Sequence, residues 1–289
     1  MSRVRTKDIL IHATQNKYGV ASINAFSYDS INWIITAAER EKIPVIVMVP
    51  PGFDKWVPIR FLSHMAKDLA DRAAVPVAVH LDHSKSYDIA IGGIRDGFPS
   101  IMVDGSALPY EENVAMTSAV VKTARVFNID VEAELGHVGM GSNLDDIVNS
   151  DNYTSVEQAV EFVQRTGCDS LAIAVGNAHG AYIKEPNLDF DRIKAIRSKL
   201  DIPLVLHGCS GIPDEQIQQS VNLGMSKFNI FTEFDAAVYH SYKHAITRIA
   251  EGGYPNATYF RNVLPELGEP VVDFLRSRLR LLNPNKITV

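Results

Sequence analysis

The sequence is poor in cysteine, in long apolar runs and in surplus positive charge. Its 289 residues include only two cysteines, Cys168 and Cys209, which are too few for a disulfide framework and lack the paired spacing of a zinc ribbon. No run approaches the roughly 18 apolar residues of a membrane span, and the N-terminal residues lack the apolar core of a signal peptide. The formal net charge of −6 provides no basic surface for nucleic acid. We therefore expect a cytoplasmic protein with reduced thiols and with neither a membrane nor a nucleic-acid partner.

The length and the 46% hydrophobic content allow one large core. Barrels of alternating strands and helices commonly use about 250 residues as a single domain. We expect one domain over residues 1–289.

Short apolar runs rich in β-branched residues recur along the chain, and each is followed by a stretch with helical periodicity. The expected strands are Val20–Ala25, Val45–Val49, Val77–Leu81, Ser100–Val103, Asp130–Leu135, Ser170–Val175, Leu204–His207 and Lys227–Ile230. The expected helices are Ile31–Glu41, Ile59–Ala73, Tyr87–Gly93, Glu112–Phe127, Ser155–Arg165, Phe190–Lys199, Asp214–Leu223 and Asp235–Ala250.

The expected strands are almost continuously apolar, which is typical of parallel strands buried on both faces. Eight such units predict an α/β fold that closes into a (β/α)₈ TIM barrel. An open Rossmann-like sheet is the alternative, but the chain has neither a G-x-G-x-x-G turn nor a P-loop. Residues 252–289 exceed what the barrel needs and predict a C-terminal helical extension with a helix at Pro270–Leu282, which could pack across a subunit interface.

Polar side chains follow most of the expected strands, where a barrel places its catalytic groups. A single histidine at such a position is more often structural than a metal ligand. His83, His179 and His207, however, come from strands three, six and seven and would converge on one mouth of the barrel. This pattern fits a three-histidine site with an open position for substrate. His80 and His137 are weaker candidates that could equally support the site or a strand end.

Three carboxylates accompany these histidines. Asp82 could act as a general base toward substrate, or it could orient an imidazole that binds the ion. Asp104 and Glu134 leave the same choice between binding the ion and supporting its ligands.

Glycines and hydroxyls gather after strands six, seven and eight, where barrels usually bind phosphate. The residues concerned are Gly180, Gly208, Ser210, Gly211 and Thr232. Each glycine alone is explained by ordinary turn chemistry, but their position beside two of the histidines favours a binding site.

The segments H-L-D-H, V-D-G-S, V-E-A-E-L-G, G-N-A-H-G-A-Y, P-L-V-L-H-G-C-S-G and K-F-N-I-F-T-E resemble the class II fructose- and tagatose-bisphosphate aldolases over nearly the whole chain. The resemblance implies a metal-dependent aldolase, a carbon–carbon lyase that releases dihydroxyacetone phosphate from a phosphorylated ketose. Asp82 would be the catalytic acid and base. The expected Zn²⁺ ligands are His83, His179 and His207.

The resemblance also assigns supporting residues and partners. Asp104 and Glu134 match positions that bind or support a second metal position. The substrate and its phosphate would be held by Asn24, Gly180, Gly208, Ser210, Asn229 and Thr232, with a monovalent cation near the phosphate. Relatives are dimers or tetramers, so we expect a homodimer or homotetramer in which Arg276, Arg278 and Arg280 could reach a neighbouring site.

Three departures from the family concern the half of the site that handles the aldehyde. The loop after strand five reads Gly139–Asn143 and lacks a glutamate, for which Asp145 or Asp146 could substitute unless both are solvated loop charges. Pro50-Pro51-Gly52 replaces a serine-containing turn. Asp235 stands where bisphosphate-cleaving relatives often place a basic residue, and it would repel a phosphate. We therefore expect the aldehyde specificity to be shifted away from the standard 1,6-bisphosphates.

Two other functions remain open at this point. A non-catalytic barrel that stabilises or regulates a partner is consistent with the missing glutamate, although the intact Asp82 and histidines oppose it. A different phosphate-binding barrel enzyme, such as an isomerase, would not release dihydroxyacetone phosphate by carbon–carbon cleavage.

Overall fold

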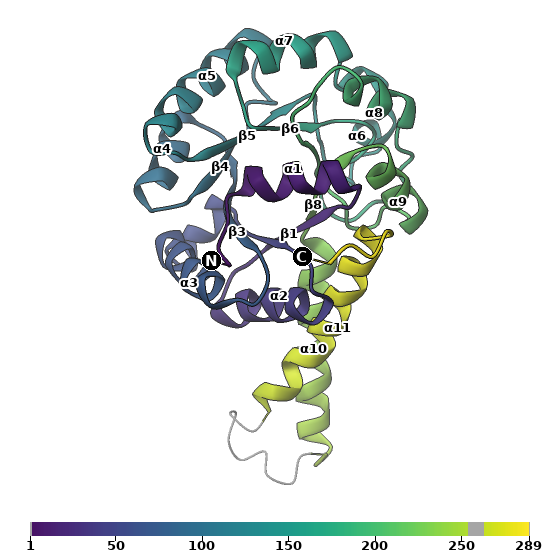
Figure 1. Ribbon diagram of the computed structural model, residues 1–289. Coiled ribbons are helices and arrows are strands. Elements are labelled where there is room, and N and C mark those ends of the chain that lie inside the picture. Colours follow the sequence, from purple (N-terminus) through teal and green to yellow (C-terminus); the bar gives the residue numbers. More distant parts are fainter. Residues whose placement is uncertain (1, 254–262, 289) are drawn as a thin grey trace.

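The computed structural model describes residues 2–253 and 263–288 and contains a closed barrel of eight parallel strands in sequential order (Figure 1). The expected (β/α)₈ architecture is confirmed. The strands are β1 Val20–Asn24, β2 Val45–Val49, β3 Val77–Ser84, β4 Ser100–Val103, β5 Asp130–Leu135, β6 Ser170–Ile173, β7 Leu204–Leu206 and β8 Met225–Ile230.

Helices surround the barrel and follow the strands, as the periodicity predicts. They are α2 Tyr28–Glu41, α3 Ile59–Arg72, α4 Tyr87–Arg95, α5 Tyr110–Val126, α7 Val156–Thr166, α8 Phe190–Arg197, α9 Asp214–Asn222 and α10 Thr232–Ala250. Shorter elements lie in the loops, namely η1 Pro51–Lys55, α6 Leu144–Val148 and η2 Ser150–Asn152. Most boundaries differ from the expected ones by up to three residues, because caps such as the Ser27 capping box set the ends.

The two faces of the strands carry different residues. Apolar residues such as Val47, Val79 and Leu81 belong to the same buried cluster as the helices and therefore face outward from the barrel. Successive side chains of a strand point to opposite faces, so their neighbours point inward. The inward side chains include buried polar and charged groups, among them His80, Glu132, Glu134, Lys227 and Asn229. The barrel interior is therefore unusually polar for a protein core.

Besides the short α6, one helix was not anticipated from the sequence. Helix α1, Thr6–Asn16, lies across the N-terminal end of the barrel (Figure 1). Its Ile9 and Leu10 pack against Val20, Ile46 and Ala78 near the beginnings of three strands. Its buried Ile9, Leu10 and Ala13 have helical spacing, but the helix precedes the first strand and so lies outside the pattern of a strand followed by a helix. It closes this end and leaves the opposite end of the barrel for function.

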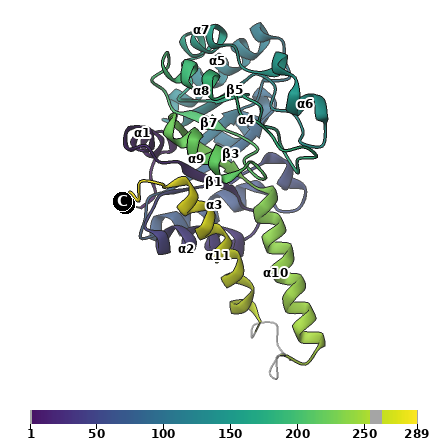
Figure 2. The same ribbon diagram turned by 90° about the vertical axis from the view of Figure 1, so that its right-hand side faces the viewer.

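The C-terminal extension is helical, as expected, but its helix begins earlier than predicted. Helix α11 spans Leu264–Leu282 and contains Pro270 in its interior, rather than starting there. It packs against α2, and with α10 it extends beyond the barrel (Figure 2). Residues 254–262 and Val289 of the predicted extension, like Met1 of the predicted domain, lie outside the described residues. Within those residues, no helix combines the length and the hydropathy that a membrane crossing requires.

The arginines of α11 are engaged within their own chain. Arg276 and Arg280 both donate to Glu41 of α2, with N–O distances of 2.6 to 2.8 Å. Arg278 donates to Asp214 at 2.9 Å. These ion pairs attach α11 to the barrel, and the expected reach of the arginines toward a neighbouring subunit stays a prediction.

Replacement of Glu41 tests this attachment. Because Glu41 is only 15% exposed and binds two guanidinium groups, we expect Glu41→Ala to lower the free energy of unfolding by about 1–2 kcal/mol in urea denaturation. The control is Asp68→Ala, which removes an exposed partner of Arg72 and should change stability by less than about 0.5 kcal/mol. Equal effects of the two substitutions would contradict a specific role for Glu41.

Candidate active site

A cavity of about 270 Å³ opens at the C-terminal ends of the strands. Most of the residues predicted for the site line it, together with Pro50 and Phe231, which were not predicted. The predicted residues are Asn24, Asp82, His83, His179, Gly180, Gly208, Ser210, Asn229 and Thr232. They come from five different strand ends, so the barrel itself brings them together.

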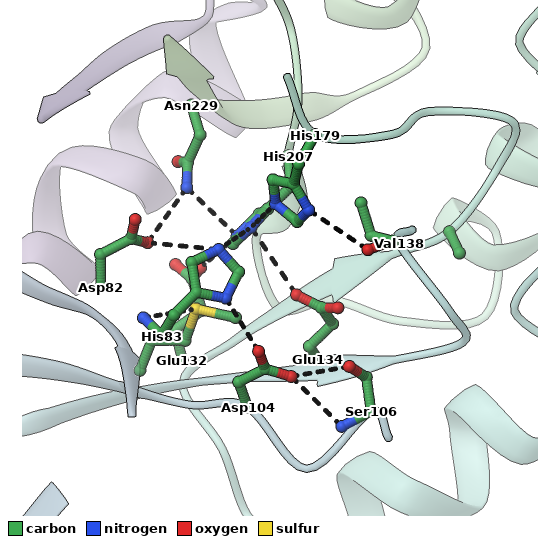
Figure 3. Close-up of polar contacts among 12 residues, drawn as sticks. Asp82, His83, Asp104, Ser106, Glu132, Glu134, Val138, His179, His207 and Asn229 are labelled. Atoms are coloured by element: carbon green, nitrogen blue, oxygen red, sulfur yellow. Dashed lines mark hydrogen bonds and ion pairs between the residues drawn. The ribbon is translucent and has the colours of Figure 1, made fainter. Parts of the chain in front are cut away.

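Three histidine rings meet at one edge of this cavity (Figure 3). The Nδ1 atom of His207 lies 3.1 Å from Nε2 of His83 and 3.4 Å from Nε2 of His179. Nitrogen atoms of all three rings lie within 4.8 Å of one another, as the ligands of one ion would.

The opposite nitrogen of each ring is held by a hydrogen-bond acceptor. Nδ1 of His83 is 3.0 Å from Asp104, and Nδ1 of His179 is 3.2 Å from the carbonyl oxygen of Val138. Nε2 of His207 is 3.0 Å from Glu132. Such partners fix the tautomer and direct the remaining lone pair toward the common point. The donor set therefore fits a divalent metal ion.

Two further carboxylates lie beside His83. Asp104, Glu134 and His83 form a second group of possible ligands. Oε2 of Glu134 is buried without a hydrogen-bond partner among the described residues, at 3.6 Å from Nδ1 of His207. Burial and the adjacent Asp104 raise the pKa of Glu134 to about 8. A buried carboxyl oxygen without a partner is well suited to a nearby cation.

The electrostatic environment gives the three histidines different pKa values. Burial, followed by the charge on His83, lowers the pKa of His179 to about 4, and the pKa of His207 is lowered in the same way. Burial also opposes protonation of His83, but Asp82 and the hydrogen bond to Asp104 outweigh it and raise its pKa to about 9. The carboxylates around His83 thus favour a cation at this point, and a proton and a metal ion would compete for it.

The end of β3 directs Asp82 and His83 into the same cavity. Adjacent residues of a regular strand point to opposite faces. Here the pairing of β3 with β4 shifts between Leu81 and Ser84, and His83 adopts a left-handed backbone conformation with φ of 50°. This irregularity turns His83 toward the cavity that Asp82 already faces.

Asp82 is held as an ionised carboxylate. Asn24 donates to it at 3.2 Å and Asn229 at 3.3 Å. Burial alone would raise the pKa of Asp82, but the positive charges of His83 and Lys227 and the hydrogen bond from Asn24 outweigh burial and lower it. A carboxylate positioned by two amides can accept a proton from a ligand in the cavity.

The predicted phosphate-binding residues lie along the same cavity. Gly208 has a φ of 62°, and a Cβ atom there would lie 1.9 Å from the carbonyl oxygen of Ala178, so only glycine fits. Thr232 is the first residue of α10, whose N-terminus has no side-chain cap. Backbone N–H groups at a helix N-terminus attract anions. Ser210 adds a hydroxyl that accepts a hydrogen bond from the N–H of Glu233.

Other sequence candidates lie away from the cavity. His80 is completely buried and bonded to Ser100, and burial followed by the charge of Lys227 lowers its pKa to about 3. His137 is half-exposed and pairs with Asp146. Asp146 also accepts from the N–H of Met140. Neither Asp145 nor Asp146 lines the cavity, and Asp146 instead stabilises its own loop.

The sequence model described as Fructose-bisphosphate aldolase class-II matches residues 4–286. The chain belongs to the class II fructose-bisphosphate aldolase family. It is an aldolase, a carbon–carbon lyase, in a family that generally depends on divalent metal and acts on phosphorylated sugars.

Relatives of this class II aldolase include proteins from bacteria and a fungus. YdjI of Escherichia coli K12, an uncharacterized protein, is 42% identical over 221 residues, which cover 76% of this chain and 80% of YdjI. The crystal structure of the YdjI aldolase superposes with a TM-score of 0.83 at 35% identity, covering 97% of each chain.

Two further solved structures are similar. Fructose-bisphosphate aldolase from Campylobacter jejuni has a TM-score of 0.82 at 25% identity over 98% of this chain and 96% of its own. A candidate fructose-1,6-bisphosphate aldolase from Coccidioides immitis has a TM-score of 0.81 at 26% identity over 96% of each chain.

Two residues of this aldolase site were assigned no role from the sequence. Lys227 is fully buried in β8 and lies 2.9 to 3.0 Å from both oxygens of Glu132, which in turn binds His207. A lysine in an apolar strand was a sign of an internal ion pair, since lysine is almost never fully buried unless paired. Its partner could not be identified without the fold.

Removal of the Lys227 charge tests whether this pair supports the aldolase site. We expect Lys227→Met to lower the free energy of unfolding by about 3–5 kcal/mol, because Glu132 would stay buried without its cation. The double variant Lys227→Met/Glu132→Gln should recover much of the loss, since the amide keeps an acceptor for His207. Urea denaturation measures both. A double variant no more stable than Lys227→Met would show that the uncompensated charge is not the cause.

Proposed function

We propose that this chain is a divalent-metal-dependent aldolase that cleaves a phosphorylated ketose to dihydroxyacetone phosphate and an aldehyde. The observation that supports it best is the convergence of three histidine nitrogens beside Asp82 in one cavity that also contains the N-terminus of α10. His83, His179 and His207 would hold the ion, with Asp104 and Glu134 at a second position. A bound Zn²⁺ or similar ion would supply Lewis-acid stabilisation of negative charge on the substrate oxygens.

Asp82 is the proton acceptor in this proposal. Cleavage between C3 and C4 of the ketose requires removal of the proton from the C4 hydroxyl. Asp82 is ionised and buried, and its oxygens are positioned by Asn24 and Asn229, so it can take this proton and return it in the synthetic direction.

The phosphate of the ketose would bind on the side of Gly180, Gly208, Ser210 and Thr232. Gly208 lets the backbone approach closely, and the N-terminus of α10 contributes backbone N–H groups. A monovalent cation beside the phosphate belongs to the same proposal.

We also propose a homodimer or homotetramer. Helices α10 and α11 extend beyond the barrel (Figure 2). Tyr239, Ile246 and Ile249 of α10 are 62%, 64% and 41% exposed. Large apolar side chains gathered on a protruding element favour contact with another subunit.

The catalytic proposal predicts the behaviour of Asp82→Asn. The amide keeps the shape of the side chain but cannot accept the proton, so kcat for dihydroxyacetone phosphate release should fall by about 10²–10⁴. KM should change little. Asp201→Asn, an exposed carboxylate remote from the cavity, serves as the matched control. A coupled assay for dihydroxyacetone phosphate measures both variants, with and without a chelator and after Zn²⁺ is added back.

Chelation should abolish release, and Zn²⁺ should restore it in the wild type and in the control. Release that resists chelation would contradict the metal role. Metal binding without release from any ketose 1-phosphate or 1,6-bisphosphate would instead favour a non-catalytic regulatory barrel.

The specificity proposal concerns Asp235. Its negative charge should repel a phosphate at the distal end of the substrate, so we expect ketose 1-phosphates to be cleaved with a kcat/KM about tenfold or more above that of fructose and tagatose 1,6-bisphosphates. Asp235→Asn should narrow this difference by improving bisphosphate cleavage. Efficient, selective cleavage of either bisphosphate by the wild type would refute the shift.

A further inference from the structure

A second pocket, of about 470 Å³, lies next to the active-site cavity and is lined mainly by aromatic rings. Its walls are formed by Phe26, Phe53, Trp56, Val57, Phe231 and Asp235. The catalytic proposal gives the aromatic residues of this pocket no role.

The rings of this aromatic pocket pack around Phe53. The ring centroids of Trp56, Phe231 and Phe26 lie 5.5, 5.8 and 6.4 Å from that of Phe53. Trp56 nevertheless remains 68% exposed. A large indole held at an opening by a neighbouring ring provides an apolar contact surface at little cost in conformational entropy.

The aromatic pocket is continuous with the active-site cavity, because Phe231 lines both. Two other strand ends also contribute to both spaces. At the end of β1, Asn24 faces the cavity, and two residues later Phe26 faces the aromatic pocket. After β2, Pro50 faces the cavity, while the turn that begins at Pro51 carries Phe53 into the pocket.

The lining of the aromatic pocket carries negative charge. Asp235 is the one charged side chain among the residues that line it. Lys55 lies outside the lining, with its Nζ atom 4.2 Å from the centroid of the Trp56 ring. A carboxylate beside apolar rings disfavours an anionic ligand and accepts an uncharged one.

We propose that the aromatic pocket binds the end of the substrate remote from its phosphate, so that the aldehyde released is uncharged and has an apolar group at its far end. This inference rests on the proposed aldolase reaction and specifies the substrate class for it. Dihydroxyacetone phosphate occupies the cavity, and the remainder of the ketose passes Phe231 into the pocket. The turn Pro50-Pro51-Gly52 thus carries Phe53 and Trp56 to the pocket, in place of a serine-containing turn that would offer a hydroxyl to the substrate.

The test uses the enzyme in the synthetic direction, with dihydroxyacetone phosphate and a panel of aldehydes. Butanal and succinic semialdehyde form a matched pair, since both have four carbons and only the second has a terminal carboxylate. Glyceraldehyde and glyceraldehyde 3-phosphate extend the comparison to a short polar aldehyde and a phosphorylated one. We expect butanal to be used with a kcat/KM about tenfold or more above that of succinic semialdehyde.

Trp56→Ala should lower kcat/KM for butanal by about tenfold and leave that for glyceraldehyde and the KM for dihydroxyacetone phosphate unchanged. The matched control is Phe61→Ala, because Phe61 is also an exposed aromatic residue, 50% exposed, but lines neither space. This substitution should leave kcat/KM unchanged for every aldehyde. Sedimentation of both variants reports their oligomeric state.

Three outcomes would overturn the inference. Glyceraldehyde 3-phosphate or succinic semialdehyde could be the best acceptor. Trp56→Ala could affect all aldehydes equally or none. Trp56→Ala could also dissociate an oligomer without changing the choice of aldehyde, in which case a second copy of the chain covers the pocket. Failure of the proposed function itself is distinguishable, because no aldehyde would then condense even in the wild type.

Discussion

The buried ion pair of Lys227 with Glu132 is the interaction on which the arrangement of the site depends. Inside a barrel closed by helices, neither charge has water to stabilise it, so each is tolerable only because of the other. The pair fixes the Glu132 carboxyl group where it can accept a hydrogen bond from Nε2 of His207. That hydrogen bond directs the opposite nitrogen of the ring toward His83 and His179, so the geometry at the mouth is set by a charge placed deeper in the barrel.

The C-terminal end of the barrel is organised in the same way. Supporting residues there fix the orientation of the side chains that face the cavity. Asp104 orients His83, and Asn24 and Asn229 orient Asp82. The left-handed conformation of His83 carries a backbone cost of order 1–3 kcal/mol that the surrounding structure must offset. Side chains placed in advance need little rearrangement when charge develops during a reaction.

The sequence predicted the barrel and the residues of the cavity because both follow from local patterns. Apolar strands and periodic helices are visible residue by residue, and strand ends in a barrel meet by necessity. The remainder depends on contacts between distant segments. The position of helix α1 across the barrel end follows only from its packing on Val20, Ile46 and Ala78. Lys227 and Glu132 are 95 residues apart, and Phe26, Trp56 and Phe231 are brought together only by barrel closure. The start of α11 was misplaced because Pro270 reads as a first-turn residue, whereas packing against α2 tolerates it inside the helix.

Closure of the N-terminal end by α1 has a kinetic consequence. Because α1 covers the N-terminal end, substrate and both products enter and leave at the C-terminal end of the barrel, where the active-site cavity opens. The fragment nearer that opening has to depart before the deeper one can follow. The order in which the two products inhibit the enzyme is therefore a direct report of which half of the sugar lies deeper in the barrel.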